Sequence, residues 1–307
     1  MVAHPVPGAK IGHLKHSRKP PITGVYPYFR QAQAALYNNK KWEQGEADEA
    51  MHRTVPGKMR CIAVALSKGG VGKTTTAVNL AAGLVRRGRS VLLVDMDTQG
   101  QVAKMLGIQP QNGMAEVINN EARLDEAVVE ARPGLWLLPG GRTLAGLKRV
   151  IDRKEYGGER TISETLAPLD GCYDYAIVDT APGWDVLTVN ALFYAEEVVA
   201  PVALEAMSLQ GLVEFEHSLQ AIQRYHNSLR LRYVLPTFLD RRVRKSDNML
   251  RQLQTHYGDL VCTPIRYNVR LSEAPGFGQT IFEHAPASPG AEDYLALTER
   301  ILHDEQP

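Results

Sequence analysis

The chain of 307 residues lacks the side-chain patterns of a disulfide scaffold or a structural metal site. Its three cysteines, Cys61, Cys172 and Cys262, stand far apart, and the nine histidines show no metal-ligand spacing. We therefore expect reduced cysteines in the core of a cytosolic protein. Long apolar runs are missing too: no stretch approaches the roughly 20 residues that span a bilayer, and the N-terminus has no apolar signal-peptide core.

An overall excess of charge of one sign is also missing, because 35 Lys and Arg face 34 Asp and Glu. The first 41 residues are an exception, with seven basic residues, no acidic residue and several prolines. We expect residues 1–57 to form an N-terminal extension outside the main fold, disordered in its first half and helical near Tyr28 to Met51. Contact with DNA phosphates, an acidic partner or a membrane surface, and a purely solvated tail, all stay open.

What the sequence does contain is a glycine-rich loop from Lys68 to Thr75. An apolar run at 61–66 predicts a strand before it, and a helix is predicted from Thr75 to Gly88. Such a loop lets backbone N–H groups converge on phosphate oxygens at a helix N-terminus. Lys73 would reach the β- and γ-phosphates, and the Thr74 hydroxyl would ligate Mg²⁺. The predicted nucleotide contacts here are Lys68, Gly69, Gly70, Val71, Gly72, Lys73, Thr74 and Thr75.

The loop departs from the standard phosphate-binding pattern at its start. Ser67 stands where the first glycine usually falls, and an additional cation, Lys68, precedes the glycines. The loop therefore matches a deviant version of the motif. A glycine-rich turn without a ligand is the structural alternative.

Carboxylates follow two further apolar runs. The run from Ser90 ends in Asp95 and Asp97, and the run from Tyr175 ends in Asp179. Ligands of open α/β sheets bind at the carboxyl ends of the strands, so these side chains are predicted to share the site with the loop. Asp179 has the position of a magnesium-binding Walker B aspartate. The alternative for each carboxylate is a helix cap.

The remaining periodicity predicts alternating strands and helices, and therefore a doubly wound, mostly parallel α/β sheet over residues 58–307. Further strands are expected at 135–139, 197–203, 231–238 and 260–265. Helices are expected near 99–106, 161–166, 188–195, 208–224, 246–257 and 291–302.

Several segments resemble the ParA/Soj partitioning ATPases over roughly residues 58–303. They are the loop KGGVGKTT, the runs VLLVDMDTQG and IVDTAPG, the stretch 201–212, and the C-terminal blocks NVRLSEAP and GAEDYLAL. The two C-terminal blocks are the most specific, because the loop alone indicates only an ATPase with a signature lysine. Thr98 replaces the usual proline, and Arg266-Tyr267 replaces a Pro-Arg pair in a neighbourhood linked to nucleotide and DNA contacts.

The resemblance implies a homodimer that closes around two ATP molecules. Lys68 would reach the nucleotide of the partner subunit, and Asp97 would help position the attacking water. With Lys73 and Asp179 they form the implied catalytic set, and Thr74, Asp97 and Asp179 the implied Mg²⁺ set. Pro201 and Asn268 are the further nucleotide contacts that it implies.

A basic excess lies between Arg224 and Arg251, with eight Lys or Arg against two Asp. Non-specific DNA binding requires such a patch. The candidate DNA contacts are Arg241, Arg242, Arg244, Lys245 and Arg270, of which the resemblance matches Arg242 and Arg270 to DNA-holding positions. A solvated helix face is the alternative.

Together with these observations, the resemblance implies a slow, DNA-dependent cytoplasmic ATPase that coats the nucleoid as an ATP-bound dimer and is released by a ParB-like partner. Its cargo could be a plasmid, a chromosome or, in an orphan system, a protein assembly. A MinD-like membrane-cycling ATPase is a second class, disfavoured because the last residues are too acidic for an interfacial helix. An iron–sulfur ATPase is a third, disfavoured by the isolated cysteines.

Overall fold

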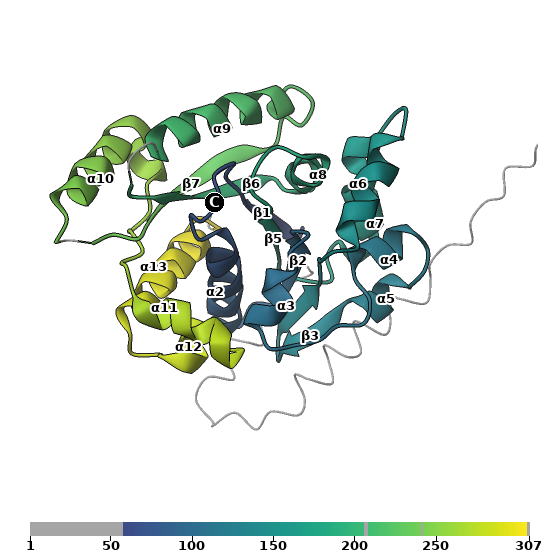
Figure 1. Ribbon diagram of the computed structural model, residues 1–307, viewed down its shortest axis with the longest axis horizontal. Helices are drawn as coiled ribbons and strands as arrows, with labels where there is room; N and C mark the ends of the chain where they lie inside the picture. Colours follow the sequence, from purple (N-terminus) through teal and green to yellow (C-terminus); the bar gives the residue numbers. More distant parts are fainter. Residues whose placement is uncertain (1–57, 206–207, 241, 306–307) are drawn as a thin grey trace, which may run out of the picture.

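The structure is a computed structural model that describes residues 58–205, 208–240 and 242–305 (Figure 1). The N-terminal extension with its expected helix lies outside the described residues, as does Arg241. Element labels follow Figure 1. Among the described residues no helix is long and apolar enough to cross a membrane.

A seven-stranded sheet forms the centre of the fold, in the order β3-β4-β2-β5-β1-β6-β7. All neighbouring strands are parallel except β3 and β4, which are antiparallel. The doubly wound, mostly parallel architecture is therefore confirmed. The strands are β1 (Arg60–Val64), β2 (Val91–Met96), β3 (Val129–Arg132), β4 (Leu135–Leu138), β5 (Tyr175–Thr180), β6 (Glu197–Ala203) and β7 (Arg230–Thr237).

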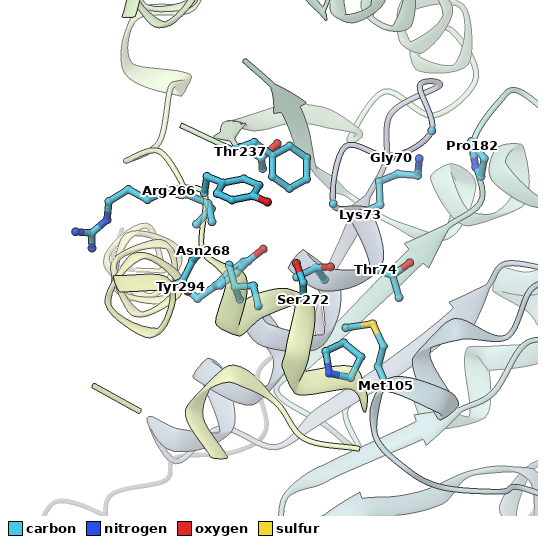
Figure 2. Close-up of a pocket in the computed structure, with 18 of the residues that line it drawn as sticks. Gly70, Lys73, Thr74, Met105, Pro182, Thr237, Arg266, Asn268, Ser272 and Tyr294 are labelled. Carbon is cyan, nitrogen blue, oxygen red and sulfur yellow. The ribbon is translucent and has the colours of Figure 1, made fainter. Parts of the chain in front are cut away.

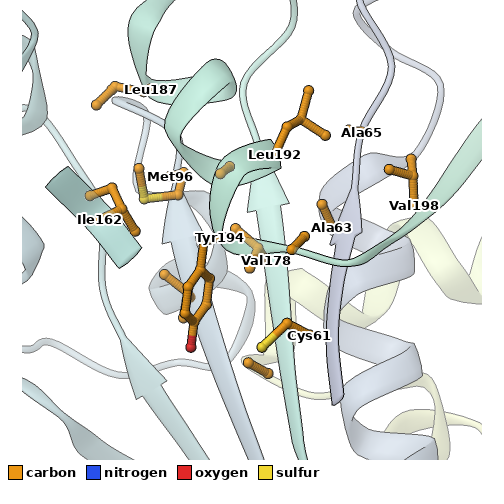
Figure 3. Packing of buried hydrophobic residues seen from close by; sticks show 14 of the residues in the cluster. Cys61, Ala63, Ala65, Met96, Ile162, Val178, Leu187, Leu192, Tyr194 and Val198 are labelled. Atoms are coloured by element: carbon orange, nitrogen blue, oxygen red, sulfur yellow. The ribbon is translucent and has the colours of Figure 1, made fainter. Parts of the chain in front are cut away.

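The two faces of the sheet carry separate hydrophobic clusters, because successive side chains of a strand point to opposite faces. On β1, Ile62 and Val64 join one cluster, with α2 (Lys73–Arg86) and α13 (Pro289–His303). Ala63 joins the other, with α8 (Val186–Tyr194) and α9 (Ser208–Gln223). Figure 3 shows this second face, where Leu192 of α8 lies over the sheet near Ala63 and Val178. Every residue of β2 and β5 is buried, as strands covered on both sides must be.

Local signals explain where the main helices begin. Asp185 accepts hydrogen bonds from the backbone N–H groups of Leu187 and Thr188, so α8 starts earlier than predicted. Ser288 caps α13, with a proline at its first turn. The other helices are α3 (Gln101–Met105), α4 (Met114–Ile118), α5 (Leu124–Ala127), α6 (Leu144–Asp152), α7 (Thr161–Leu166), α10 (Arg244–Tyr257), α11 (Val269–Glu273) and α12 (Ile281–His284). Short 3₁₀ turns lie at 158–160, 167–169, 258–260 and 274–277.

One predicted strand, at 260–265, is wrong. The segment runs beside β7 and donates hydrogen bonds from Cys262 N–H to Val234 O and from Ile265 N–H to Pro236 O, both at 2.8 Å. Only isolated bridges form there, at Val261 and Arg266. Because Pro264 has no N–H, the segment cannot continue a regular ladder. The sequence reading also missed strand β3 and helix α6.

Helices α2 and α13 contact each other at a glycine (Figure 1). A Cβ added to Gly83 would lie 2.2 Å from Thr298 Oγ1 and 3.3 Å from Thr298 Cβ. Thr298 is fully buried and its hydroxyl donates to Tyr294 O at 2.8 Å, so it cannot easily turn away. The C-terminal helix is thereby fixed against the helix that carries the glycine-rich loop.

We therefore predict that Gly83→Ala lowers the free energy of unfolding by about 1–3 kcal/mol, because it overpacks this contact. Urea denaturation followed by circular dichroism measures the change. Gly211→Ala in α9 is the matched control: nothing lies within 4 Å of the added Cβ, so it should stabilise the protein by about 0.5–1 kcal/mol. Equal stability of the Gly83 variant and the unaltered protein would contradict the packing argument.

Candidate nucleotide-binding site

The glycine-rich loop follows β1 and leads directly into α2. Gly70 and Gly72 have φ values of 73° and 89°, in the left-handed region that favours glycine. A hydrogen bond holds the loop against the sheet: the buried Thr237 hydroxyl at the end of β7 donates to Val71 O at 3.0 Å. Helix α2 begins at Lys73, so its unpaired N-terminal N–H groups belong to the loop, where they can bind phosphate.

Lys73 is a buried cation, with only 6% of the residue exposed. Its ammonium donates to Lys68 O at 2.8 Å, across the loop. Burial lowers the pKa of Lys73, while Asp179 and Asp97 act in the opposite direction. A charged group in this environment is stabilised by additional negative charge, which phosphates would supply.

The strand order explains how the carboxylates come together, because β2, β5 and β1 are neighbours in the sheet. Asp95 of β2 lies in register with Asp179 of β5. Asp95 is fully buried and accepts hydrogen bonds from the N–H groups of Asp97 and Val102 at 2.9 and 3.3 Å. Burial raises the pKa of Asp95 to about 7. Asp95 therefore holds the backbone turn that presents Asp97.

Asp179 is fully buried, and neither carboxylate oxygen has a partner with hydrogen-bond geometry. Burial and the nearby Asp95 raise its pKa well above the ordinary value, and the neighbouring Thr74 hydroxyl and Lys73 ammonium oppose that rise. A buried carboxylate without a partner is costly unless a cation or a donor satisfies it. These residues fit Mg²⁺, which proteins bind through one or two carboxylates together with substrate phosphates and water.

A cavity of about 500 Å³ opens over the loop (Figure 2). In Figure 2, Gly70, Lys73, Thr74 and Pro182 lie on one side, and Arg266, Asn268 and Tyr294 on the other. The first side is the loop and the strand ends, and the second is formed by residues 265–275 and α13. The cavity thus has a polar end suited to phosphates and a second end with aromatic and aliphatic side chains.

Most predicted nucleotide contacts line this cavity, namely Gly69, Gly70, Gly72, Lys73, Thr74, Thr75 and Asn268, and so does the predicted catalytic residue Asp97. Four predicted site residues do not line it. Val71 is buried beneath the loop, Asp179 is buried near Thr74, and Lys68 is half-buried at the start of the loop. Pro201 is buried within β6, in register with Leu235, so the structure does not bring its side chain to the cavity.

Sequence reasoning missed much of the second end of the cavity. The lining residues that were not singled out are Met105, Thr237, Phe238, Ile265, Leu271, Ser272, Pro275 and Tyr294. Thr180 and Pro182 of the IVDTAPG run and the Arg266-Tyr267 pair also line the cavity, in segments that the sequence had indicated. Several of those not singled out belong to the NVRLSEAP block or lie next to it, so the presence of that block could have indicated them. The rest come from the end of β7 and from α3 and α13, where only the folded chain brings them together.

The Arg266-Tyr267 pair has two distinct environments. Arg266 donates from its backbone N–H and its guanidinium to Asp293 at 2.8 and 3.0 Å, and from its guanidinium to Glu292 at 2.9 Å. Its charge is therefore held at α13. Tyr267 is 60% exposed at the cavity.

The candidate DNA residues lie on the surface. The Arg242 side chain is 85% exposed and forms two hydrogen bonds to Asp240, whose pKa it lowers to about 2. Arg270 is also exposed and pairs with Glu273 at 2.7 Å. Arg244 and Lys245 are exposed in the first turn of α10. The described members are thus accessible, although two of them are paired with carboxylates.

Comparison with known proteins identifies the family. The model of a family described as an AAA domain matches residues 59–231. The chromosome-partitioning ATPase Soj of Thermus thermophilus is 41% identical over 247 residues, which cover 80% of this chain and 96% of that protein. The chain belongs to the Soj/ParA family. The chromosome partitioning protein ParA of Caulobacter vibrioides is 34% identical, with 81% and 96% covered.

A solved structure shares the fold. Cobyrinic acid a,c-diamide synthase of Mycobacterium smegmatis, with bound ADP and magnesium, is similar with a TM-score of 0.70 and 31% identity, covering 81% of this chain and 96% of that one. The predicted ParA/Soj resemblance is confirmed. This Soj/ParA protein is a P-loop ATPase that uses ATP and Mg²⁺.

The environment of Asp179 generates a prediction about stability. Asp179→Asn should raise the free energy of unfolding of the nucleotide-free protein by about 1–3 kcal/mol at pH 8, because it removes a buried charge without partners. The raised pKa means that the folded state binds the proton more tightly, so stability falls as the pH rises above about 4. The gain should therefore vanish below about pH 4, where Asp179 is protonated in both states. Denaturant unfolding at the two pH values measures it.

The matched control is Asp185→Asn. Asp185 is partly exposed, caps α8 and pairs with Lys148, so its replacement should not stabilise the protein. A gain for Asp179→Asn that persists at low pH would contradict the charge argument.

Proposed function

We propose that this Soj/ParA ATPase dimerises when it binds ATP, binds DNA without sequence specificity in that state, and segregates a plasmid or chromosome region with a ParB-like partner. The observation that supports the proposal is that one segment, residues 265–273, carries both residues of the nucleotide cavity and a candidate DNA contact. Asn268 and Leu271 of this segment line the nucleotide cavity. Arg270, a candidate DNA contact, lies between them on α11.

The loop lysines provide a way to sense the nucleotide. Lys73 now donates to Lys68 O. In our proposal the β- and γ-phosphates compete for the Lys73 ammonium, because a charge-assisted bond to phosphate is stronger than a bond to a neutral carbonyl. The contact that holds the Lys68 backbone is then lost. Lys68 becomes able to turn toward the nucleotide of the partner subunit, and its cation would stabilise the charge that develops during phosphoryl transfer.

In our proposal the two carboxylates Asp97 and Asp179 have different roles. Asp97 lines the cavity and is positioned by Asp95, so it is suited to orient the attacking water. Thr74 and the buried Asp179 would hold Mg²⁺, with Asp97 available to a water ligand. Mg²⁺ supplies charge neutralisation between the phosphates. In our proposal Asn268 contacts the nucleotide, and its Oδ1 already caps α11 by accepting from Arg270 N–H at 2.9 Å. We give Pro201 only an indirect role, as part of β6.

DNA binding would use the exposed arginines. Arg242 and Arg270 are neutralised by Asp240 and Glu273. Surface ion pairs of this kind contribute little, so DNA phosphates can replace the carboxylates at small cost. Arg242 precedes Val243, which shares a surface hollow with Tyr267, a residue that lines the nucleotide cavity. Both arginines therefore lie close to residues that would respond to nucleotide, and the nucleoid is the location that this proposal implies.

Two alternatives differ from this proposal: one in the cargo that is moved, and the other in binding a membrane surface in place of DNA. An orphan ATPase that positions a protein assembly would use the same DNA binding with another partner. A MinD-like cycle would need an amphipathic helix to enter the membrane interface. Helix α13 does not offer its apolar face for this purpose, because Tyr294, Leu297 and Ile301 are buried in the cluster shared with α2. The described part of the chain thus favours DNA over a membrane.

The DNA surface is tested by salt dependence. Binding to double-stranded DNA of random sequence should require ATP, and log K should fall by roughly 0.9 per phosphate contact for each tenfold rise in salt. Arg242→Ala and Arg270→Ala should each flatten that slope by about one unit per contact and leave ATP binding unchanged. Fluorescence anisotropy over a salt series measures the slope.

The control for the two arginine variants is Arg87→Ala. Arg87 is exposed and paired with Glu299, but it lies at the far end of α2 from the loop. Its replacement should leave the slope unchanged. If the arginine variants bind normally and a deletion of residues 1–57 abolishes binding, DNA contact belongs to the N-terminal extension instead.

A further inference from the structure

Three aromatic side chains line the nucleotide cavity, and they differ in how much of each is exposed. Tyr294 is 1% exposed, and its hydroxyl lies 3.2 Å from Thr76 Oγ1, so it is part of the core. Phe238 lies over the glycine-rich loop, because a Cβ on Gly72 would be 3.8 Å from its ring. It therefore belongs to the phosphate end. Tyr267 is the most exposed of the three, at 60% against 38% for Phe238, and Figure 2 places its chain neighbours Arg266 and Asn268 on the side of the cavity opposite the loop.

The backbone around Tyr267 is fixed although its ring is exposed. Its N–H donates to Leu239 O at 3.0 Å, and Leu239 N–H donates to Ile265 O at 3.0 Å. On one side Arg266 is held by Asp293, and on the other Asn268 caps α11. An aromatic ring on a fixed backbone loses little conformational entropy when a ligand stacks on it.

Tyr267 is also accessible from two directions. It lines the nucleotide cavity and a second hollow of about 590 Å³, which it shares with Gly70 of the loop, Phe238 and Val243. Its ring therefore offers apolar surface that a ligand in either hollow could cover. The arginine that precedes it in the sequence does not compete for this place, because Figure 2 shows Arg266 extending away from the phosphate end.

We propose that Tyr267 is the platform on which the adenine base of the nucleotide stacks, and that it sets the affinity for adenine nucleotides. The proposal rests on the nucleotide placement in the proposed function. With phosphates at Gly70 to Thr74, the base must lie toward the far end of the cavity, where Tyr267 offers the exposed π-face. Aromatic rings stack on bases through this face and need no hydroxyl group.

The test compares ligands with and without a base. ADP is used with Mg²⁺ because our proposal does not expect ADP to close the dimer, and pyrophosphate with Mg²⁺ is the probe without a base. Tyr267→Ala should raise the Kd for ADP by about tenfold. Tyr267→Phe keeps the π-face and should bind ADP within about twofold of the unaltered protein. Calorimetry measures ADP binding, and thermal-shift titration measures pyrophosphate binding.

The outcomes separate stacking from other roles. Unchanged pyrophosphate binding by Tyr267→Ala, together with weakened ADP binding, supports the platform. Equal losses for both ligands would mean a structural role, and no loss for ADP would mean that Tyr267 serves another contact, such as a second copy of the chain; either result overturns the proposal. Lys73→Ala distinguishes failure of the site itself, because unchanged ADP and pyrophosphate binding in that variant would refute the nucleotide placement.

Discussion

The burial of charge at the ends of three neighbouring strands is the constraint on which this structure depends. Strands β5 and β2, and helix α2 that follows β1, bring Asp179, Asp95 and Lys73 into one buried region, where burial disfavours the charged form of each. Protein stability alone would favour apolar residues at these positions. Such groups are useful when a ligand supplies the missing partners, and Mg²⁺ with phosphates does so for both signs of charge.

The connection from this site to the surface runs through one segment. Residues 265–273 begin beside the end of β7, where Ile265 N–H donates to Pro236 O and Arg266 forms one isolated bridge with Leu239, and they continue into the short helix α11. The same segment carries Arg266, fixed to α13, and Arg270, paired with Glu273 on the surface. Irregular segments of this kind are easier to shift than a continuous ladder. A nucleotide that contacts Asn268 can therefore influence Arg270 over a short, physically continuous path.

The phosphate end of the site could be predicted from the sequence, because it depends on local patterns. A glycine-rich loop before a helix and carboxylates after apolar runs lie at the same sheet edge whenever the strands are parallel neighbours. The sequence could not reveal that Asp95 supports the Asp97 turn, since both residues follow the same run and only register and burial separate them.

The base end depends on contacts far apart in the chain. Phe238 follows β7, Tyr294 lies in α13, and Tyr267 lies two residues beyond the segment 260–265 that was wrongly predicted as a strand. Periodicity does not indicate which of these rings stays exposed. Pro201 is an error of the opposite kind. The resemblance to partitioning ATPases predicted it as a nucleotide contact, but it is buried within β6.

The central claim is that the nucleotide controls assembly through the loop lysines. Analytical ultracentrifugation of the unaltered protein and of Lys68→Ala, each with ATP or ADP and Mg²⁺, tests it most directly. The account predicts a dimer only for the unaltered protein with ATP, while Lys68→Ala binds nucleotide but stays monomeric. A Lys68→Ala dimer that forms with ATP and hydrolyses it at the normal rate would contradict the account.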